Sequence, residues 1–196
     1  MEINRLDVYP HNFSEKIGYS EVRHLLEEYC ASSLGREEMQ ALEASADKED
    51  IVRALDETRE MITIMAGESP LPSLALVDCR DVLRRIRPQG TFIEEEELLD
   101  LLRMLETLHS LQRFFLEEHT TGERVAETFA YTYPRLASLL EDTPSFPKIE
   151  SHLRSLLTEE GKLRDNASRD LLRIRQTIRE TERSLSGMLQ RILSTA

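Results

Sequence analysis

The chain has 196 residues, 40% of them hydrophobic and 32% charged, which is enough for one folded domain or a domain with an arm. Its net charge of −12 argues against a nucleic-acid-binding surface spread over the whole molecule. No apolar run approaches the roughly 18 residues of a membrane span, and the N-terminus lacks a signal-peptide pattern. Cys30 and Cys79 have no metal-binding spacing, so we expect reduced thiols in a cytoplasmic protein with no membrane partner.

The N-terminal third is predicted to form three helices. Ser20 is a suitable N-cap for a helix over 21–31, Ser33 can cap a second over 33–42, and Asp47 begins a third. Apolar residues recur at helical spacing in the first and third, which predicts the faces that pack into the core. The predicted buried face of the first helix consists of Val22, Leu25, Leu26 and Tyr29. That of the third consists of Ile51, Leu55, Thr58, Ile62 and Met65.

The middle of the chain is also predicted to be helical, with proline and glycine separating the helices. Residues 69–72 contain two prolines and are typical of a rigid connector. Helices are predicted over 78–87 and 94–118, and a turn centred on Gly161 predicts at most one short β-hairpin near 158–165. Weaker periodicity predicts three more helices, over 122–130, 134–141 and 147–157. The predicted fold class is therefore all-α.

The C-terminal segment is predicted to be one long helix that reaches Ala196 without a stop signal. Its apolar residues are spaced alternately three and four apart, with Thr181 filling one gap, which is the pattern of a coiled coil or a long lever helix. We call the following residues the seam: Leu171, Ile174, Ile178, Leu185, Met188 and Ile192. Because natural helices usually end with Gly or Asn and a nearby Pro, we expect a piece cut from a longer protein. The seam favours a homodimer.

Charge is distributed unevenly along the chain. Residues 162–196 carry eight basic and four acidic side chains, so this segment is +4 and the rest of the molecule is −16. An ordinary solvated helix face explains such a balance, and weak contacts with phosphate are the alternative. The residues that would make those contacts are Arg169, Arg173, Arg179 and Arg183.

A search for catalytic motifs finds no GxxxxGK[ST] loop, no GxGxxG, no HExxH and no Cys–His grouping with metal-ligand spacing. We therefore expect no catalytic residue, cofactor or metal site in this chain, and no enzymatic activity of its own. Two Glu-x-x-His pairs, Glu21 with His24 and Glu106 with His109, match the pattern of di-iron bundles. His24 is predicted to point away from the apolar face of its helix. A di-metal enzyme is therefore the least favoured of the functions considered.

Three further clusters have ordinary structural explanations. Residues 94–97 are four glutamates that complement the dipole of a helix start. Arg84, Arg85 and Arg87 lie at a predicted helix C-terminus, where cations are favoured. Aromatic residues near helix ends are predicted to pack rather than to form a docking site: Phe114, Phe115, Tyr131 and Tyr133.

Several segments of the chain, taken together, resemble the sequence of a known protein family. Helical patterns occur at 17–22, 33–36, 78–83, 90–92 and 97–99. A more specific segment, Gly161-Lys162-Leu163-Arg164-Asp165-Asn166-Ala167-Ser168, leads into 171–175. Over residues 17–190 the chain resembles the second class of the bacterial MutS family, which lacks the mismatch-reading domain and begins with the helical core. One departure is Ala44, where that family usually has proline, and residues 1–16 extend the usual start.

The resemblance implies an N-terminal extension (1–16), a helical core of MutS type (17–160) and a turn with the first part of the lever (161–196). Intact proteins of this class are dimeric ATPases with a C-terminal nuclease domain, linked to branched DNA, suppression of recombination and rescue of collided ribosomes. The resemblance therefore implies ATP and magnesium as cofactors of the longer protein, and DNA or the ribosome as its partner. The fragment itself would be non-catalytic and would couple the ATPase domain to the clamp at the lever tip. In the longer protein the resemblance implies that the seam packs on the returning arm of the lever, which is not in this chain.

A function of a different class remains as the alternative. A stand-alone helical adaptor would use the same seam to bind a helix of a partner protein. One observation distinguishes the two functions. A fragment of a MutS-like ATPase requires a GxxxxGK[ST] motif downstream in the same reading frame, and a stand-alone adaptor does not.

Overall fold

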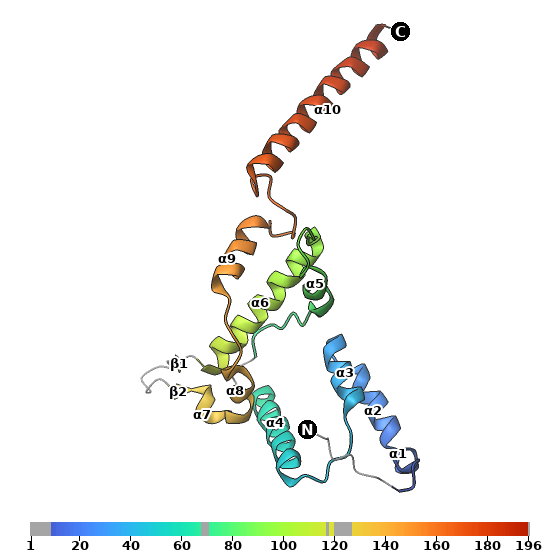
Figure 1. Ribbon diagram of the computed structural model, residues 1–196, viewed down its shortest axis with the longest axis vertical. Helices are drawn as coiled ribbons and strands as arrows, with labels where there is room; N and C mark the ends of the chain where they lie inside the picture. The colour runs from blue at the N-terminus through green and yellow to red at the C-terminus, as the bar shows by residue number, and fades with distance from the viewer. Residues whose placement is uncertain (1–8, 68–70, 117, 120–126, 196) are drawn as a thin grey trace.

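The computed structural model describes residues 9–67, 71–116, 118–119 and 127–195. The molecule is elongated, with α6 (Glu95–Leu116) through the middle of the core and α10 (Arg169–Thr195) projecting from one end (Figure 1). The fold class is all-α, as predicted. The described strands are two-residue segments, β1 (Glu118–His119) and β2 (Glu127–Thr128), which pair antiparallel.

The region after α6 departs from the sequence prediction. A helix was predicted over 122–130, but residues 127–128 pair in β2 and α7 (Phe129–Thr132) begins only at Phe129. Residues 122–126 of that predicted helix lie outside the described part of the chain. The periodicity of a short segment carries no information about a second segment that pairs with it. The antiparallel pairing of β1 and β2 could therefore not be predicted from the sequence of 122–130.

The start of α6 explains the acidic run at 94–97. The Glu97 carboxylate accepts a hydrogen bond from the Glu94 backbone N–H at 2.9 Å, and the Arg85 guanidinium also donates to it. These two hydrogen bonds lower the pKa of Glu97. The structure therefore supports the predicted role of these glutamates at a helix N-terminus, and it places Arg85 in a structural ion pair.

A first core cluster surrounds the N-terminal half of α6. There α9 (Pro147–Leu156) and the segment that leads into α5 (Arg80–Arg85) pack against it. The buried members are Cys79, Leu101, Leu102, Leu105, Leu153 and Leu157. The Thr107 hydroxyl accepts a hydrogen bond from the Ala75 N–H at 3.0 Å, which fixes this segment along α6.

A second core cluster lies at the other end of α6, where α4 (Lys48–Ala66) and α8 (Pro134–Glu141) meet it. Its buried members are Ile64, Phe115, Leu136 and Ala137. The Glu60 carboxylate of α4 accepts hydrogen bonds from the backbone N–H groups of Arg135 and Leu136, at 3.1 and 2.9 Å. These N–H groups lie at the start of α8, where they have no partner within the helix. The N-cap residue Tyr133 makes no side-chain hydrogen bond to them, so Glu60 of α4 caps α8 instead.

The first three helices form an arm of their own in Figure 1: α1 (Phe13–Lys16), α2 (Tyr19–Glu28) and α3 (Ser33–Ala41). Two predicted caps were wrong by one or two residues. Gly18, in the left-handed region with φ 72°, precedes α2 in place of Ser20. The residue that caps α3 is Ser32 rather than Ser33, because its hydroxyl accepts from the Gly35 N–H at 3.0 Å.

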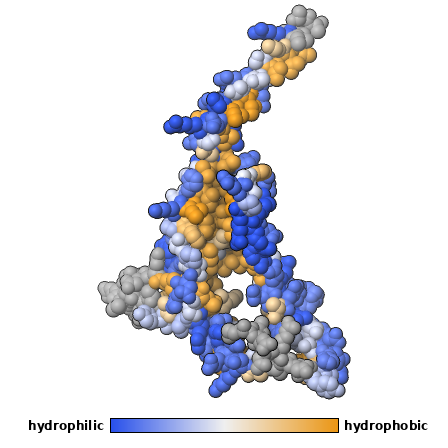
Figure 2. All heavy atoms as spheres, in the orientation of Figure 1, coloured by the Kyte–Doolittle hydropathy of each residue, from blue (hydrophilic) through white to orange (hydrophobic). Residues whose placement is uncertain are grey.

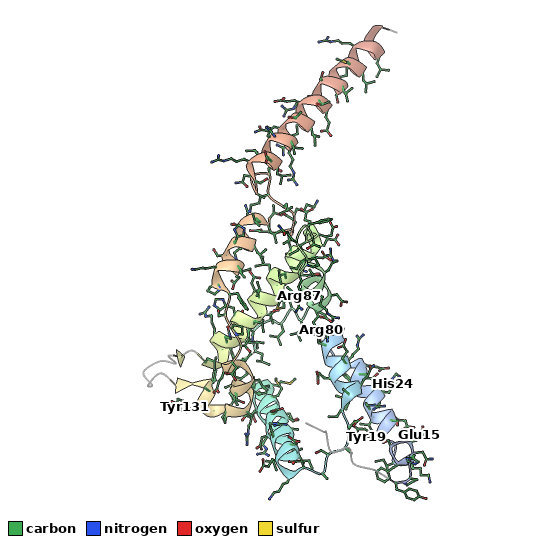
Figure 3. All side chains as sticks on the ribbon, viewed as in Figure 1. Glu15, Tyr19, His24, Arg80, Arg87 and Tyr131 are labelled. Carbon is green, nitrogen blue, oxygen red and sulfur yellow. The ribbon has the colours of Figure 1, made fainter. Side chains whose placement is uncertain are left out.

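The buried face predicted for α2 is exposed, which corrects the sequence prediction. Its residues are 44–85% exposed: Val22, Leu25, Leu26 and Tyr29. The physical reason is that α2 packs on its short neighbours α1 and α3, which cover little of its surface. Arg80 of α5 links this arm to the core, with its Nη2 2.7 Å from Glu37 Oε2 (Figure 3). Hydrogen bonds from Arg80 also lower the pKa of Asp78 to about 2.

The face predicted for α4 was also wrong, although its boundaries were correct. Asp47 caps α4 by accepting from the Glu49 and Asp50 N–H groups, and Gly67 ends the helix. The predicted stripe is exposed: Ile51, Leu55, Thr58, Ile62 and Met65. The buried residue is Ile64, which is 2% exposed and faces α8, so the core lies on the other side of the helix.

The remaining predictions give mixed results. Phe114 and Phe115 pack edge to face with ring centroids 5.0 Å apart, as predicted. Tyr131 is 89% exposed, so its predicted packing was wrong (Figure 3). Of the connector predicted at 69–72, the described residues have no helix or strand, and residues 69 and 70 lie outside the described part. Among the described helices, none combines the length and apolarity that a bilayer span requires.

Candidate functional site at the base of the projecting helix

The chain reverses direction directly after α9. Leu157 and Leu163 form an antiparallel bridge, and the Thr158 N–H donates to the Lys162 carbonyl at 2.8 Å. The Arg164 N–H donates in turn to the Leu156 carbonyl, also at 2.8 Å. The short hairpin predicted near 158–165 is therefore present as a single bridge around a tight turn.

Gly161 lies at the centre of this turn and is buried against α6. Its φ is 80°, in the left-handed region that favours glycine. A Cβ at this position would overlap the Leu99 side chain of α6, well inside van der Waals distance. Both the backbone conformation and the close approach to α6 therefore require glycine here.

Two further contacts bind the turn to the core. The Leu163 N–H donates to the Glu95 carboxylate at the start of α6. Arg164 Nε donates to the Leu157 carbonyl at 2.7 Å. One contact involves α6 and the other the end of α9, so the turn is fixed to two core helices.

The next residues attach α10 to the turn. Asp165 Oδ1 accepts from Arg175 Nη1 at 2.5 Å, and its second oxygen accepts from Arg179. Arg175 Nη1 also donates to the Leu163 carbonyl at 3.0 Å. Hydrogen bonds from the two arginines lower the pKa of Asp165. Ser168 then caps α10 by accepting from the Leu171 N–H at 3.0 Å.

We call this arrangement the joint. It comprises residues 157–168, together with Glu95 and Leu99 of α6 and Arg175 and Arg179 of α10. The joint connects the core to the first three turns of α10 through one close-packed glycine and a set of hydrogen bonds. Such a base can hold the direction of a projecting helix.

The seam of α10 lies in solvent beyond the joint. Four of its residues, Ile174, Ile178, Leu185 and Met188, are 50–57% exposed, and Leu171 is half-buried. The backbone of Ile192 is helical, and its side chain lies outside the described part. Figure 2 shows hydrophobic residues along one side of α10. The structure thus leaves an apolar stripe along α10 for another helix to cover.

The four arginines proposed for phosphate contacts have different surroundings. Arg179 donates to Asp165 in the joint, and Arg173 Nη2 lies 3.4 Å from Asp170 Oδ1 on the same helix. Arg169 and Arg183 are exposed. Phosphate contacts by these four residues remain a prediction. Arg179 already donates a hydrogen bond to Asp165 within the joint.

The two Glu-x-x-His pairs do not come together. His24 is on the exposed arm (Figure 3), with 76% of its side chain accessible. Glu106 accepts from Arg154 at 2.7 Å, while His109 Nδ1 lies 2.8 Å from Glu150 Oε2. No group of three His, Cys, Asp or Glu side chains suited to a metal occurs within the described ranges.

The contacts of Glu150 instead give it a structural role. Its side chain is nearly buried, and Arg154 donates to it at 2.7 Å. Burial opposes its ionisation, but hydrogen bonds from His109 and Arg154 outweigh that effect and lower the pKa of Glu150. This network ties α9 to α6 just before the joint.

These features define a class of protein: an all-helical core from which a long helix projects on a fixed base. No protein-family model matches the chain. It is similar to the "Endonuclease MutS2" of Finegoldia magna, with 25% identity over 177 residues, and to that of Alkaliphilus oremlandii, with 28% over 178 residues. The Geobacillus protein of the same name is 26% identical over 175 residues. The chain is therefore related to MutS2-type proteins.

The similarity covers most of this chain and a small part of each relative. The matched region is 90%, 91% and 89% of this chain, and 22%, 21% and 21% of the three relatives. The chain thus spans about a fifth of the length of the curated relatives it matches. The matched span includes most of the helical core described above.

Proposed function

We propose that this chain is the non-catalytic core and first part of the lever of a MutS-like, DNA-processing ATPase. In that role it couples an ATPase domain to a clamp, both outside this chain, in DNA repair, suppression of recombination or ribosome rescue. The similarity to proteins named "Endonuclease MutS2" supports the family. ATP and magnesium as cofactors of the longer protein, DNA or the ribosome as its partner, and a cytoplasmic location belong to the same proposal.

The joint is the observation that carries this proposal. A helix transmits motion only if its base is fixed, because a loose hinge would absorb the displacement. Here Gly161 packs on Leu99, Glu95 binds the turn, and Asp165 holds two arginines of α10. The projecting helix thus has a defined direction relative to α6.

The stiffness of the joint can be measured by electron–electron double resonance between spin labels at Ser151→Cys in α9 and Ser184→Cys in α10, with Cys30 replaced by serine. Labelled chains are diluted with unlabelled chains so that only distances within one chain are recorded. We expect a narrow distance distribution in the otherwise unchanged chain. Asp165→Ala should broaden it about twofold, because α10 loses both of its arginine contacts to the turn.

The matched control for the joint is Glu180→Ala, which removes an exposed carboxylate of α10 that takes no part in the joint. This variant should leave the distance distribution unchanged. A broad distribution in the chain with an intact Asp165, or equal broadening by both variants, would show that the joint does not orient α10. The coupling role would then be refuted.

Binding of ATP provides a second test. The chain contains no GxxxxGK[ST] loop, and phosphate recognition in such ATPases depends on the backbone N–H groups of that loop. We therefore expect no saturable heat of ATP binding at micromolar concentrations in titration calorimetry, with or without magnesium. A fitted micromolar dissociation constant would mean that an unrecognised nucleotide site exists in the chain.

Binding to DNA should be weak and should fall steeply as salt rises. The segment at 162–196 is +4, but the rest of the chain is −16 and repels phosphate. Two of the candidate arginines also have acidic partners on their own chain. Fluorescence anisotropy with duplex and four-way-junction DNA measures this affinity. Submicromolar binding at about 0.15 M salt would contradict the prediction.

The alternative function is a stand-alone adaptor that binds a partner helix. The exposed seam of α10 is the observation that favours it. The reading frame that encodes this chain distinguishes the two functions. A downstream GxxxxGK[ST] motif supports the ATPase core, and a stop codon directly after this segment supports the adaptor.

A further inference from the structure

Gly187 lies in the interior of α10, which continues beyond it to Thr195. Glycine is the weakest helix former apart from proline, because it loses the most backbone freedom when a helix forms. A glycine at an interior position therefore usually has a structural or a functional reason. Its surroundings in the structure decide between the two.

The described residues give no structural reason for glycine at this position. Gly161 in the joint is required because its φ is 80° and a Cβ would overlap Leu99. Gly187 differs in both respects. Its backbone is helical, and in the described part of the chain no atom outside its own stretch of helix lies within 4 Å of the place where a Cβ would be. Alanine would fit there without strain.

A helix packed on the seam does not require this glycine either. If Leu171 is position a of a heptad, the seam occupies positions a and d, and Gly187 is at position c. Position c lies on the side of the helix that faces away from the seam, so a helix covering the seam does not approach it. This conclusion is the same whichever segment covers the seam.

The residues around Gly187 weaken the helix at the same place. Ser186 precedes it directly, and Gly/Ser pairs are among the few places where helices bend sharply. Ser184, about one turn before Gly187, is a further weak helix former. The residues that follow, 188–191, are Met, Leu, Gln and Arg, which are all strong helix formers. The weakest stretch of α10 therefore lies at 184–187.

The position of α10 leaves bending to the helix itself. Figure 1 shows α10 projecting away from the core as one unbroken helix. The joint holds the start of this helix through the bonds of Arg175 and Arg179 to Asp165. Both arginines lie before Ser184, so the joint orients the part of α10 that precedes the weak stretch, whereas the part beyond it projects farther from the core.

We infer that Ser186 and Gly187 form a hinge in α10. The segment up to Leu185 keeps the direction that the joint sets, and the segment from Met188 onward changes direction by bending at the hinge. The hinge itself rests on the sequence and surroundings of α10. Its use rests on the proposed function: in a lever, motion of the core reaches the hinge through the fixed segment, and the part beyond the hinge reorients.

Electron–electron double resonance across Gly187 tests the hinge. Spin labels are placed at Gln176→Cys and Gln190→Cys, two exposed positions about 21 Å apart along a straight helix. Cys30 is replaced by serine, labelled chains are diluted with unlabelled chains, and samples are frozen from about 5 °C, where fraying of helix ends is reduced. We expect a broad distribution that extends to distances shorter than that of the straight helix. Gly187→Ala should lower the fraction of those short distances about fivefold.

A matched pair of labels lies entirely on the core side of the hinge. Arg169→Cys and Arg183→Cys have the same spacing along the helix, and both positions are exposed. This pair spans Thr177 and Thr181, whose hydroxyls donate to carbonyls one turn earlier at 3.0 and 2.8 Å, contacts that can also bend a helix. Its distance distribution should be narrow, with or without Gly187→Ala. An equally broad distribution would show that α10 bends along its whole length and has no hinge.

A second control separates bending from unwinding at the end of the helix. Ser194→Ala strengthens the last turn of α10 without changing the hinge, so it should leave the distribution across Gly187 unchanged. If Ser194→Ala narrows that distribution as much as Gly187→Ala does, the end of α10 unwinds and no hinge exists. A narrow distribution across Gly187 in the otherwise unchanged chain would also overturn the inference. Neither result bears on the joint, which the labels at Ser151 and Ser184 test independently, because both lie on the core side of Gly187.

Discussion

Replacing Gly161 with alanine is expected to lower the free energy of unfolding by about 2–4 kcal/mol, from left-handed backbone strain together with overpacking. The glycine has a φ of 80°, and a Cβ there would enter the space of Leu99. Leu99 packs against the first core cluster, so it cannot move aside without disturbing that cluster. Urea unfolding followed by helical circular dichroism measures the change.

Gly90 provides the control for this substitution. It also has a positive φ, 88°, but no atom lies within 4 Å of the place where its Cβ would be. Gly90→Ala should therefore lose only the backbone part, about 1–2 kcal/mol. If the two variants lose the same stability, the close approach of Gly161 to Leu99 contributes nothing and the joint is looser than described.

Helix boundaries were predictable where a single residue determines them. Asp47 caps α4, Pro134 begins α8 and Pro147 begins α9, each as the sequence indicated. Local chemistry is sufficient in these cases, because a capping carboxylate or a proline at the first position acts within one helical turn. The caps of α2 and α3 were placed one or two residues away because several serines and a glycine lie close together there.

The buried faces of helices were harder to predict. Helix α4 has an apolar stripe through Ile51 and Leu55 and a second apolar side at Met61 and Ile64, and only the second meets α8. Periodicity shows that a face is apolar, but it carries no information about which helix lies opposite. The same reasoning explains the exposed face of α2, whose neighbours are too short to cover it.

The site was only partly predictable. The segment at 161–168 was recognised from its family resemblance, but the residues that hold it were not. Glu95 and Leu99 lie more than 60 residues earlier in the chain, and no local pattern links them to the turn. Arg175 and Arg179 are spaced four apart on α10 after Asp165, which is the one signal that could have indicated a shared acidic partner.

Removing α10 is expected to abolish self-association. Each seam residue would gain about 1.5–3 kcal/mol from complete burial, and the described members of the seam are already partly covered in the single chain. Even half of that value over the seam amounts to several kcal/mol in favour of pairing. The full chain should therefore sediment as a dimer at high concentration, and a chain ending at Ser168 as a monomer.

Because the shorter chain also loses Arg175 and Arg179 from the joint, a second variant is needed. Ile178→Glu combined with Leu185→Glu keeps α10 and the joint but places charges in the seam, and it should also be monomeric. Without a partner, α10 should fray beyond about Met188, since an isolated helix of this length is marginal in water. Hydrogen exchange should accordingly show protection over 171–192 in the dimer, and in the variant weaker protection with the most rapid exchange beyond about residue 188. If the full chain is a monomer and this region is still strongly protected, the seam is covered by its own chain and α10 is not a projecting lever.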